Sequence, residues 1–107
     1  MTNLPNGPSP VEQEQEQWRE VPAATVERLN MLVRLMLDLR SLGRGSVLYL
    51  DGKAEPVLSV PVLSRRRSMA VLVVQEGGGW SYLWDSVHRT PGRSVRVAAE
   101  RIAGVTR

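Results

Sequence analysis

The chain has 107 residues, of which 42% are apolar and 23% are charged, and it contains neither cysteine nor phenylalanine. This length allows one domain, and the lack of cysteine excludes a disulfide framework, a zinc finger, an iron–sulfur cluster and a thiol nucleophile. The net charge of +3 is unevenly divided: residues 1–27 carry five acids and one arginine (net −4), and residues 28–107 carry thirteen bases and six acids (net +7).

The first 20 residues combine three prolines with an alternating Glu-Gln run and little aliphatic content. Such a segment cannot bury enough apolar surface to offset its ordering entropy, so we predict a disordered or loosely attached acidic tail at 1–20 and a single domain at 21–107. Trp18 is its one large aromatic residue, which either packs on the edge of the domain or anchors a partner. Neither a secretory signal nor an uncharged run long enough to span a bilayer is present, which favours a cytoplasmic protein without membrane contact.

A helix is predicted over 22–42, with Pro22 at its first position and Gly43 as its left-handed C-terminal cap. Apolar residues cover roughly 240° of its circumference, far more than the stripe of an ordinary surface helix. Two arrangements would cover this arc. In the first, the sheet and the C-terminal helix of the same chain cover all of it. In the second, one flank packs on the sheet and the other flank packs on a second copy or on another protein. We favour the second alternative. The residues predicted to form that interface share the apolar arc and are Leu29, Met31, Leu32, Leu35, Met36, Leu39 and Leu42.

Short apolar runs with regular turn signals follow the helix. Four strands are predicted, at 46–50, 56–63, 68–75 and 80–84, and a final helix at 94–103. Asp51-Gly52 indicates a tight hairpin, Pro61 belongs on an edge or at a bulge, and the uncharged run 68–75 predicts a central strand covered on both faces. The fold class is therefore α+β, in the order α-β-β-β-β-α, with a four-stranded antiparallel meander and both helices on one face of the sheet.

The strand at 80–84 places Trp80, Tyr82 and Trp84 on one face, because side chains alternate along a strand. In a chain without phenylalanine these rings are the bulky core under the helices. Alternatively they form an exposed platform for a nucleobase, a sugar or a cation.

Arginine is the other chemically informative residue. Arg65, Arg66 and Arg67 fall where a turn is expected, and a solvated hairpin tip is their ordinary role. The alternative is an anion-binding site in which Arg89 and Arg93 converge with them at one end of the sheet. No helix-turn-helix or RNA-recognition motif accompanies them, so nucleic acid is a possible but not favoured partner.

No catalytic residue is assigned. His88, with Asp85 and Ser86 just before it, is the one combination suggestive of acid–base or nucleophilic chemistry, yet these residue types are common in turns. No second histidine or cysteine completes a transition-metal site, and Gly77–Gly79 lacks the P-loop context. We therefore expect no metal, no cofactor and no enzymatic activity.

The C-terminal half, with Gly-Trp-Ser-Tyr-Leu-Trp followed by Ala98-Ala99-Glu100-Arg101-Ile102-Ala103, resembles small actinobacterial proteins with a tryptophan-rich strand leading into an Ala-Ala-x-Arg-Ile-Ala helix. The resemblance covers about residues 46–104 and implies a strand followed by a helix, without a function.

Taken with the apolar helix, these observations predict a non-enzymatic protein–protein interaction module or accessory subunit. It self-associates through 22–42, as a homodimer, or binds a different protein. The alternatives are a small regulator that binds nucleic acid or another polyanion, and a small-molecule sensor with an aromatic pocket.

Overall fold

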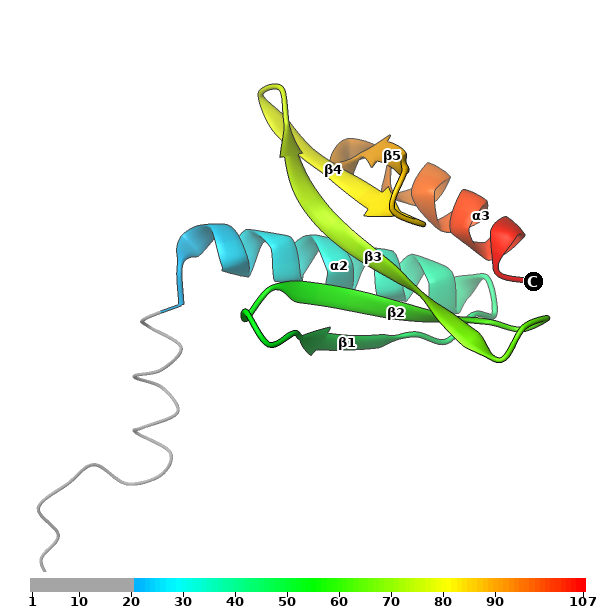
Figure 1. The fold of residues 1–107 in the computed structure, drawn as a ribbon. Coiled ribbons are helices and arrows are strands. Elements are labelled where there is room, and N and C mark those ends of the chain that lie inside the picture. The colour runs from blue at the N-terminus through cyan, green and yellow to red at the C-terminus, as the bar shows by residue number, and fades with distance from the viewer. Residues whose placement is uncertain (1–20) are drawn as a thin grey trace, which may run out of the picture.

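The computed structural model describes residues 21–107 as an N-terminal helix, an antiparallel sheet and a C-terminal helix (Figure 1). The predicted tail at 1–20 lies outside the described residues. The elements follow one another as α2 (Ala23–Ser41), β1 (Val47–Leu50), β2 (Pro56–Val62), β3 (Arg67–Glu76), β4 (Gly79–Trp84), β5 (His88–Pro91), the 3₁₀ turn η1 (Gly92–Ser94) and α3 (Val95–Val105). Within this part of the chain no helix is long and apolar enough to cross a membrane.

The α+β class and the antiparallel meander are confirmed, but the prediction of four strands is wrong, because β5 makes a fifth. The strand order is β1-β2-β3-β4-β5, with every neighbour antiparallel. In β5 only Thr90 is buried, so this short edge strand has no apolar alternation that a sequence pattern could reveal. It forms because its backbone pairs with β4, from Trp84 opposite His88 to Ser81 opposite Pro91.

Helix α2 ends as the sequence predicts. Gly43 has φ +78°, its N–H bonds to the carbonyl of Arg40, and the N–H of Arg44 bonds to the carbonyl of Leu39, both at 2.9 Å. This is the Schellman arrangement, in which a glycine in the left-handed region closes the last helical turn.

Of two sequence-based expectations about β1 and β2, the edge position of Pro61 is confirmed and the two-residue hairpin is wrong. Pro61 lies beyond the last residue that β1 pairs, Ser59, so its missing N–H falls on an edge as predicted. The turn before β2 is longer than the two-residue hairpin expected from Asp51-Gly52: it runs over residues 51–55, and the positive φ, 59°, is at Ala54. The Asp51 carboxylate holds this turn by accepting backbone N–H bonds at 2.9 Å from Lys53 and Glu55.

The core lies between the two helices and one face of the sheet. Both helices and strands β2, β3 and β4 contribute to a single cluster of buried side chains, and α3 packs beside α2 (Figure 1). Ala98, Ala99 and Ile102 form the buried face of α3, and Arg96 approaches Glu100 one turn later at 4.0 Å.

Arg44 fixes the end of α3 against the loop after α2. Its guanidinium donates to the Thr106 hydroxyl at 2.8 Å, to the Thr106 carbonyl and to the Ala103 carbonyl at 3.3 Å. The last carbonyls of a helix have no partner within the helix and carry partial negative charge, so a cation there is favourable. Arg44 thus joins two elements that are far apart in the sequence.

The opposite face of the sheet has no helix over it in the described part of the chain, and Figure 1 is viewed from that side. This differs from the prediction that the central strand is covered on both faces. Strand β3 is central, but on this face Ala70 is exposed and Leu72 and Val74 are only half-buried.

Candidate functional site

Most of the residues predicted to form an interface on α2 belong to the core of the chain itself. Leu32, Leu35 and Leu39 are completely buried, while Met31, Met36 and Leu42 pack against the same cluster. The interface prediction is therefore wrong for Leu32, Leu35 and Leu39, because the sheet and α3 together cover most of the apolar arc. Met31, Met36 and Leu42 remain partly exposed, and for them it stays a prediction.

One apolar stripe of α2 is left incompletely covered, and Leu29 is the single member of it that the sequence prediction named. Val26 is 36% exposed and Leu37 58% exposed, while Leu29 and Val33 are half-buried. At 100° per residue these four positions fall within about 80° of one another. They form one continuous strip along the helix, called here the α2 stripe.

The α2 stripe faces the β1 side of the molecule. On the other flank of the helix, Glu27 accepts a bond from the Trp80 indole, the Met31 carbonyl accepts one from Tyr82, and Ser41 accepts one from Arg96. Those contacts tie that flank to β4 and α3. The stripe lies on the opposite flank, toward the strand at the other edge of the sheet, β1.

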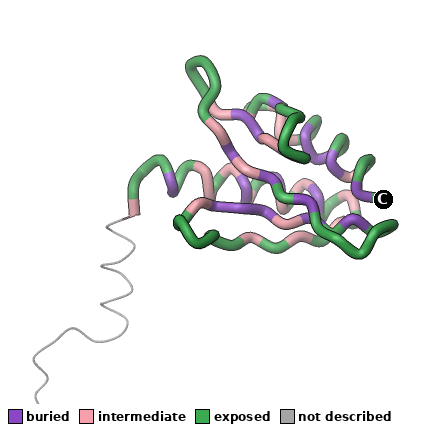
Figure 2. The backbone as a smooth tube through the Cα atoms, in the orientation of Figure 1, coloured by how far each residue is buried: buried purple, intermediate pink, exposed green. Residues whose placement is uncertain are grey.

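Strand β1 is an edge strand without a charged residue. Val47, Tyr49 and Leu50 are 62%, 46% and 50% exposed, and Leu48 is half-buried. Strand order places β2 on one side of β1 and no strand of the described chain on the other (Figure 2). Free backbone groups beside apolar side chains are a template for pairing with another strand. Together β1 and the α2 stripe form the apolar edge of the protein.

The aromatic residues of β4 are core residues. Tyr82 is fully buried and donates to the Met31 carbonyl at 2.8 Å, and Trp84 is 5% exposed and donates to the Thr90 hydroxyl at 3.3 Å. The platform interpretation is therefore wrong for these two rings. Trp80 is half-buried, with its indole N–H bonded to Glu27 at 2.7 Å. Burial raises the pKa of Tyr82 to about 12, and the positive charge of Arg34 opposes this shift.

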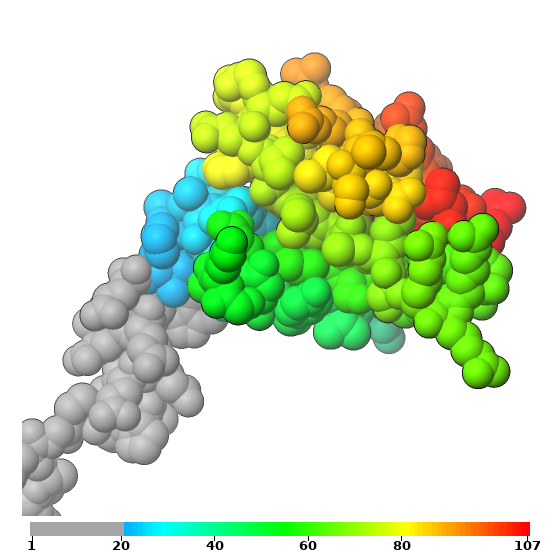
Figure 3. Space-filling model, in the orientation of Figure 1, coloured from blue at the N-terminus to red at the C-terminus, as the bar shows by residue number. Residues whose placement is uncertain are grey.

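The five arginines proposed to bind anions do not converge. Arg65, Arg66 and Arg67 are exposed at the turn between β2 and β3, which projects from the body of the protein (Figure 3). Arg89 pairs with Glu76 at 2.6 Å, and Arg93 follows β5; both lie toward the opposite end of the sheet. The chain end approaches the basic turn instead, since the Ser64 N–H bonds to the carbonyl of Arg107 at 3.2 Å.

Asp85 and Ser86 lie in the turn between β4 and β5, and His88 is the first residue of β5. Asp85 and Ser86 have φ of 54° and 64°, which suits a tight turn, and the His88 ring stacks on Trp84 with centroids 4.4 Å apart. No hydrogen bond among the three occurs in the described structure. Over residues 21–107 no group of three metal-ligating side chains comes together.

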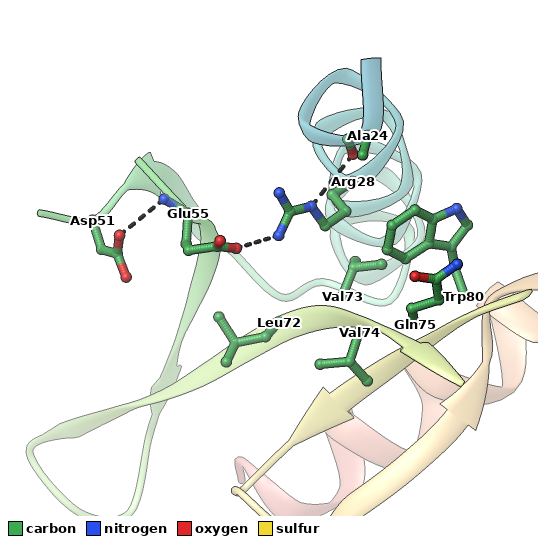
Figure 4. A pocket seen from close by; sticks show the side chains of 9 residues that line it. All are labelled: Ala24, Arg28, Asp51, Glu55, Leu72, Val73, Val74, Gln75 and Trp80. Atoms are coloured by element: carbon green, nitrogen blue, oxygen red, sulfur yellow. Dashed lines mark hydrogen bonds and ion pairs between the residues drawn. The ribbon is translucent and has the colours of Figure 1, made fainter. Parts of the chain in front are cut away.

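A cleft that the sequence did not suggest opens between the β1–β2 hairpin and β3 (Figure 4). Strand β2 pairs with β3 only as far as Val71, so the backbone of β3 from residue 72 onward has no strand partner on that side within the described chain. The cleft holds about 480 Å³ and is walled by Leu72–Val74 and Trp80, with Ala24 of α2 at its back.

Charged groups rim this cleft. Arg28 pairs with the Glu55 carboxylate and also donates to the Ala24 carbonyl at 3.3 Å (Figure 4). The Glu55 side chain is still 47% exposed, so it keeps an accessible carboxylate oxygen. Backbone N–H bonds from Glu55 and then Lys53 lower the pKa of Asp51. Two carboxylates and one guanidinium thus give the rim a net negative charge, whereas residues 21–107 as a whole carry thirteen bases and seven acids.

No protein-family model, curated protein or solved structure matches the chain. The resemblance to small actinobacterial proteins therefore stays a prediction.

Proposed function

We propose that this protein is a self-associating interaction module whose apolar edge packs against a second copy of the chain. The observation that carries the proposal is strand β1, Val47–Leu50, which has no charged residue, is exposed at three of its four positions and lies at the end of the strand order. Proteins ordinarily protect edge strands with charges, prolines or bulges. This strand has none of these within its four residues, so pairing with another strand satisfies both its backbone and its side chains.

A second copy fits the edge because the edge is self-complementary. Two β1 strands related by a two-fold axis perpendicular to the sheet pair antiparallel, which makes one continuous ten-stranded sheet from two five-stranded ones. The helix faces of the two sheets then lie on the same side. The two α2 helices run antiparallel there, and their stripes, which include Leu29, Val33 and Leu37, face each other.

The charges at the two ends of the edge support the same arrangement. Arg40 is exposed at the C-terminal end of the α2 stripe, near the start of β1, and Asp51 follows the last residue of β1. An antiparallel pair brings Arg40 of each copy toward the partner's Asp51. A two-fold interface therefore joins opposite charges at its rim while its centre is apolar, a pattern common at protein interfaces.

Sedimentation equilibrium of the full chain tests the proposal. The wild type is expected to be a dimer, and single lysines at exposed positions of the edge, Tyr49→Lys and Leu37→Lys, are expected to weaken the dimer at least tenfold, or about 1.4 kcal/mol, by placing like charges near the two-fold axis. Val87→Lys is the matched control, since Val87 is 72% exposed but lies in the β4–β5 turn.

An unchanged circular dichroism spectrum in the absence of denaturant must accompany the change in mass, so that dissociation is not confused with unfolding. A wild-type chain that remains monomeric at every concentration overturns the proposal. So does an equal response of Tyr49→Lys and Val87→Lys.

A further inference from the structure

We propose that the cleft between the β1–β2 hairpin and β3 binds the chain's own segment 15–19, with the indole of Trp18 against Leu72–Val74. Strand β3 pairs with β4 as far as Glu76, but its pairing with β2 ends at Val71. The stretch of β3 after Val71 therefore has one open edge. A peptide in extended conformation can add to such an edge through its backbone while its side chains fill the adjacent pocket. The inference does not depend on dimer formation.

Chain length lets this segment reach the cleft. Helix α2 begins at Ala23, and the next residue, Ala24, lines the cleft itself. Trp18 lies five residues before Ala23, a separation that spans at most about 17 Å when extended. A tethered group that can reach its site has a high effective concentration, so even weak contacts suffice to hold it.

Chemistry also favours this occupant. The cleft volume of about 480 Å³ is within the range of sites for small aromatic ligands, and a buried tryptophan contributes a large apolar area. Trp18 is the only aromatic residue among the first 20. Arg19 follows it directly, and the rim of the cleft carries the Asp51 and Glu55 carboxylates. An indole next to a guanidinium is thus complementary to an apolar wall with an acidic rim.

Fluorine NMR of the full chain labelled with 5-fluorotryptophan tests the proposal. The protein has three tryptophans, and Trp18→Phe identifies the resonance of Trp18. In the wild type we expect that resonance away from its position in the urea-unfolded chain and with a reduced H₂O/D₂O isotope shift. Leu72→Glu or Val74→Glu is expected to return it to the unfolded position, and Trp18→Phe is expected to shift the resonance of Trp80, which shares the cleft.

Val87→Glu, at a 72% exposed position outside the cleft, is the control and should leave the Trp18 resonance unchanged. The resonance of Trp84, which is 5% exposed, reports whether each variant remains folded. The proposal is overturned if the Trp18 resonance of the wild type lies at the unfolded position. It is also overturned if the chemical shift of Trp18 is the same in the wild type and in both glutamate variants. A resonance that moves on dilution also overturns it, because the segment would then come from a second copy. The Tyr49→Lys variant separates the two proposals, since it dissociates the dimer while Trp18 stays bound.

Discussion

Tyr82 shows how one polar atom is accommodated in the core. Its ring is fully buried, and its hydroxyl donates to the Met31 carbonyl of α2 at 2.8 Å. A buried hydroxyl without a partner is costly, so this bond fixes the distance between α2 and β4. Because burial disfavours the phenolate, the pKa of Tyr82 rises to about 12, above the ordinary value of 10.0.

This shift predicts alkaline destabilisation. Between pH 10 and pH 12 the unfolded chain loses the Tyr82 proton while the folded chain keeps it, so the free energy of unfolding falls with rising pH, by on the order of 2 kcal/mol in total. Below pH 10 the contribution is fully present. Urea titrations at pH 8 and pH 11.5 measure the effect, and Tyr82→Phe should show a smaller loss between them. An equal loss in wild type and Tyr82→Phe would assign it to other groups.

At the scale of secondary-structure elements, Arg44 connects the loop after α2 to the end of α3. Thr106 is completely buried, and its carbonyl and hydroxyl both accept bonds from Arg44. Arg44→Ala should lower the free energy of unfolding by about 2–3 kcal/mol, because charged hydrogen bonds are lost and a buried carbonyl is left with fewer partners. Arg44→Lys should recover part of this loss.

Urea unfolding gives the stability of these variants, and hydrogen exchange shows whether the loss is concentrated in α3. Arg101→Ala is the comparison, because Arg101 is exposed on the same helix. If Arg101→Ala costs as much as Arg44→Ala, the bonds to Thr106 do not anchor the helix.

Elements with a local cause could be predicted from the sequence, and those that depend on distant pairing could not. The Gly43 cap, the edge position of Pro61 and the helix at the C-terminal end follow from residue chemistry within a few positions. Strand β5 depends on its pairing with β4. In the β1–β2 turn, the sequence predicted a tight hairpin at Asp51-Gly52, but the residue with a left-handed backbone is Ala54. Gly92 is a similar case, because a side chain there would overlap with the Met31 methyl group, a contact that only the fold creates.

The candidate interface illustrates the same limit. Periodicity predicted that the apolar arc of α2 is too wide for the sheet to cover, and α3 indeed packs along one flank. It could not predict which flank α3 covers. The structure covers the flank with Leu35 and Leu42 and leaves the stripe with Val33 and Leu37. Exposure of β1 could not be foreseen either, because strand order decides which strand is at the edge.

At the scale of the whole molecule, self-association should make thermal stability depend on protein concentration. Residues 21–107 form a small domain with one core cluster, and a domain of this size has little stability in excess. Binding of the folded state alone stabilises it by mass action. For a dimer that unfolds to two chains, each tenfold increase in concentration adds about 0.7 kcal/mol per chain, which raises Tm by about 3–5 °C.

Scanning calorimetry over two decades of concentration measures this dependence in the wild type, in Tyr49→Lys and in the Val87→Lys control. The wild type and Val87→Lys should show the rise, and Tyr49→Lys should have a lower Tm at each concentration and begin to rise only at higher concentration, because its β1 edge pairs less tightly. A constant Tm in the wild type at concentrations where sedimentation finds a dimer would mean that the apolar edge adds no stability to the fold. In that case the stability of each chain would come from its own core, and the contact between copies would be weak relative to it.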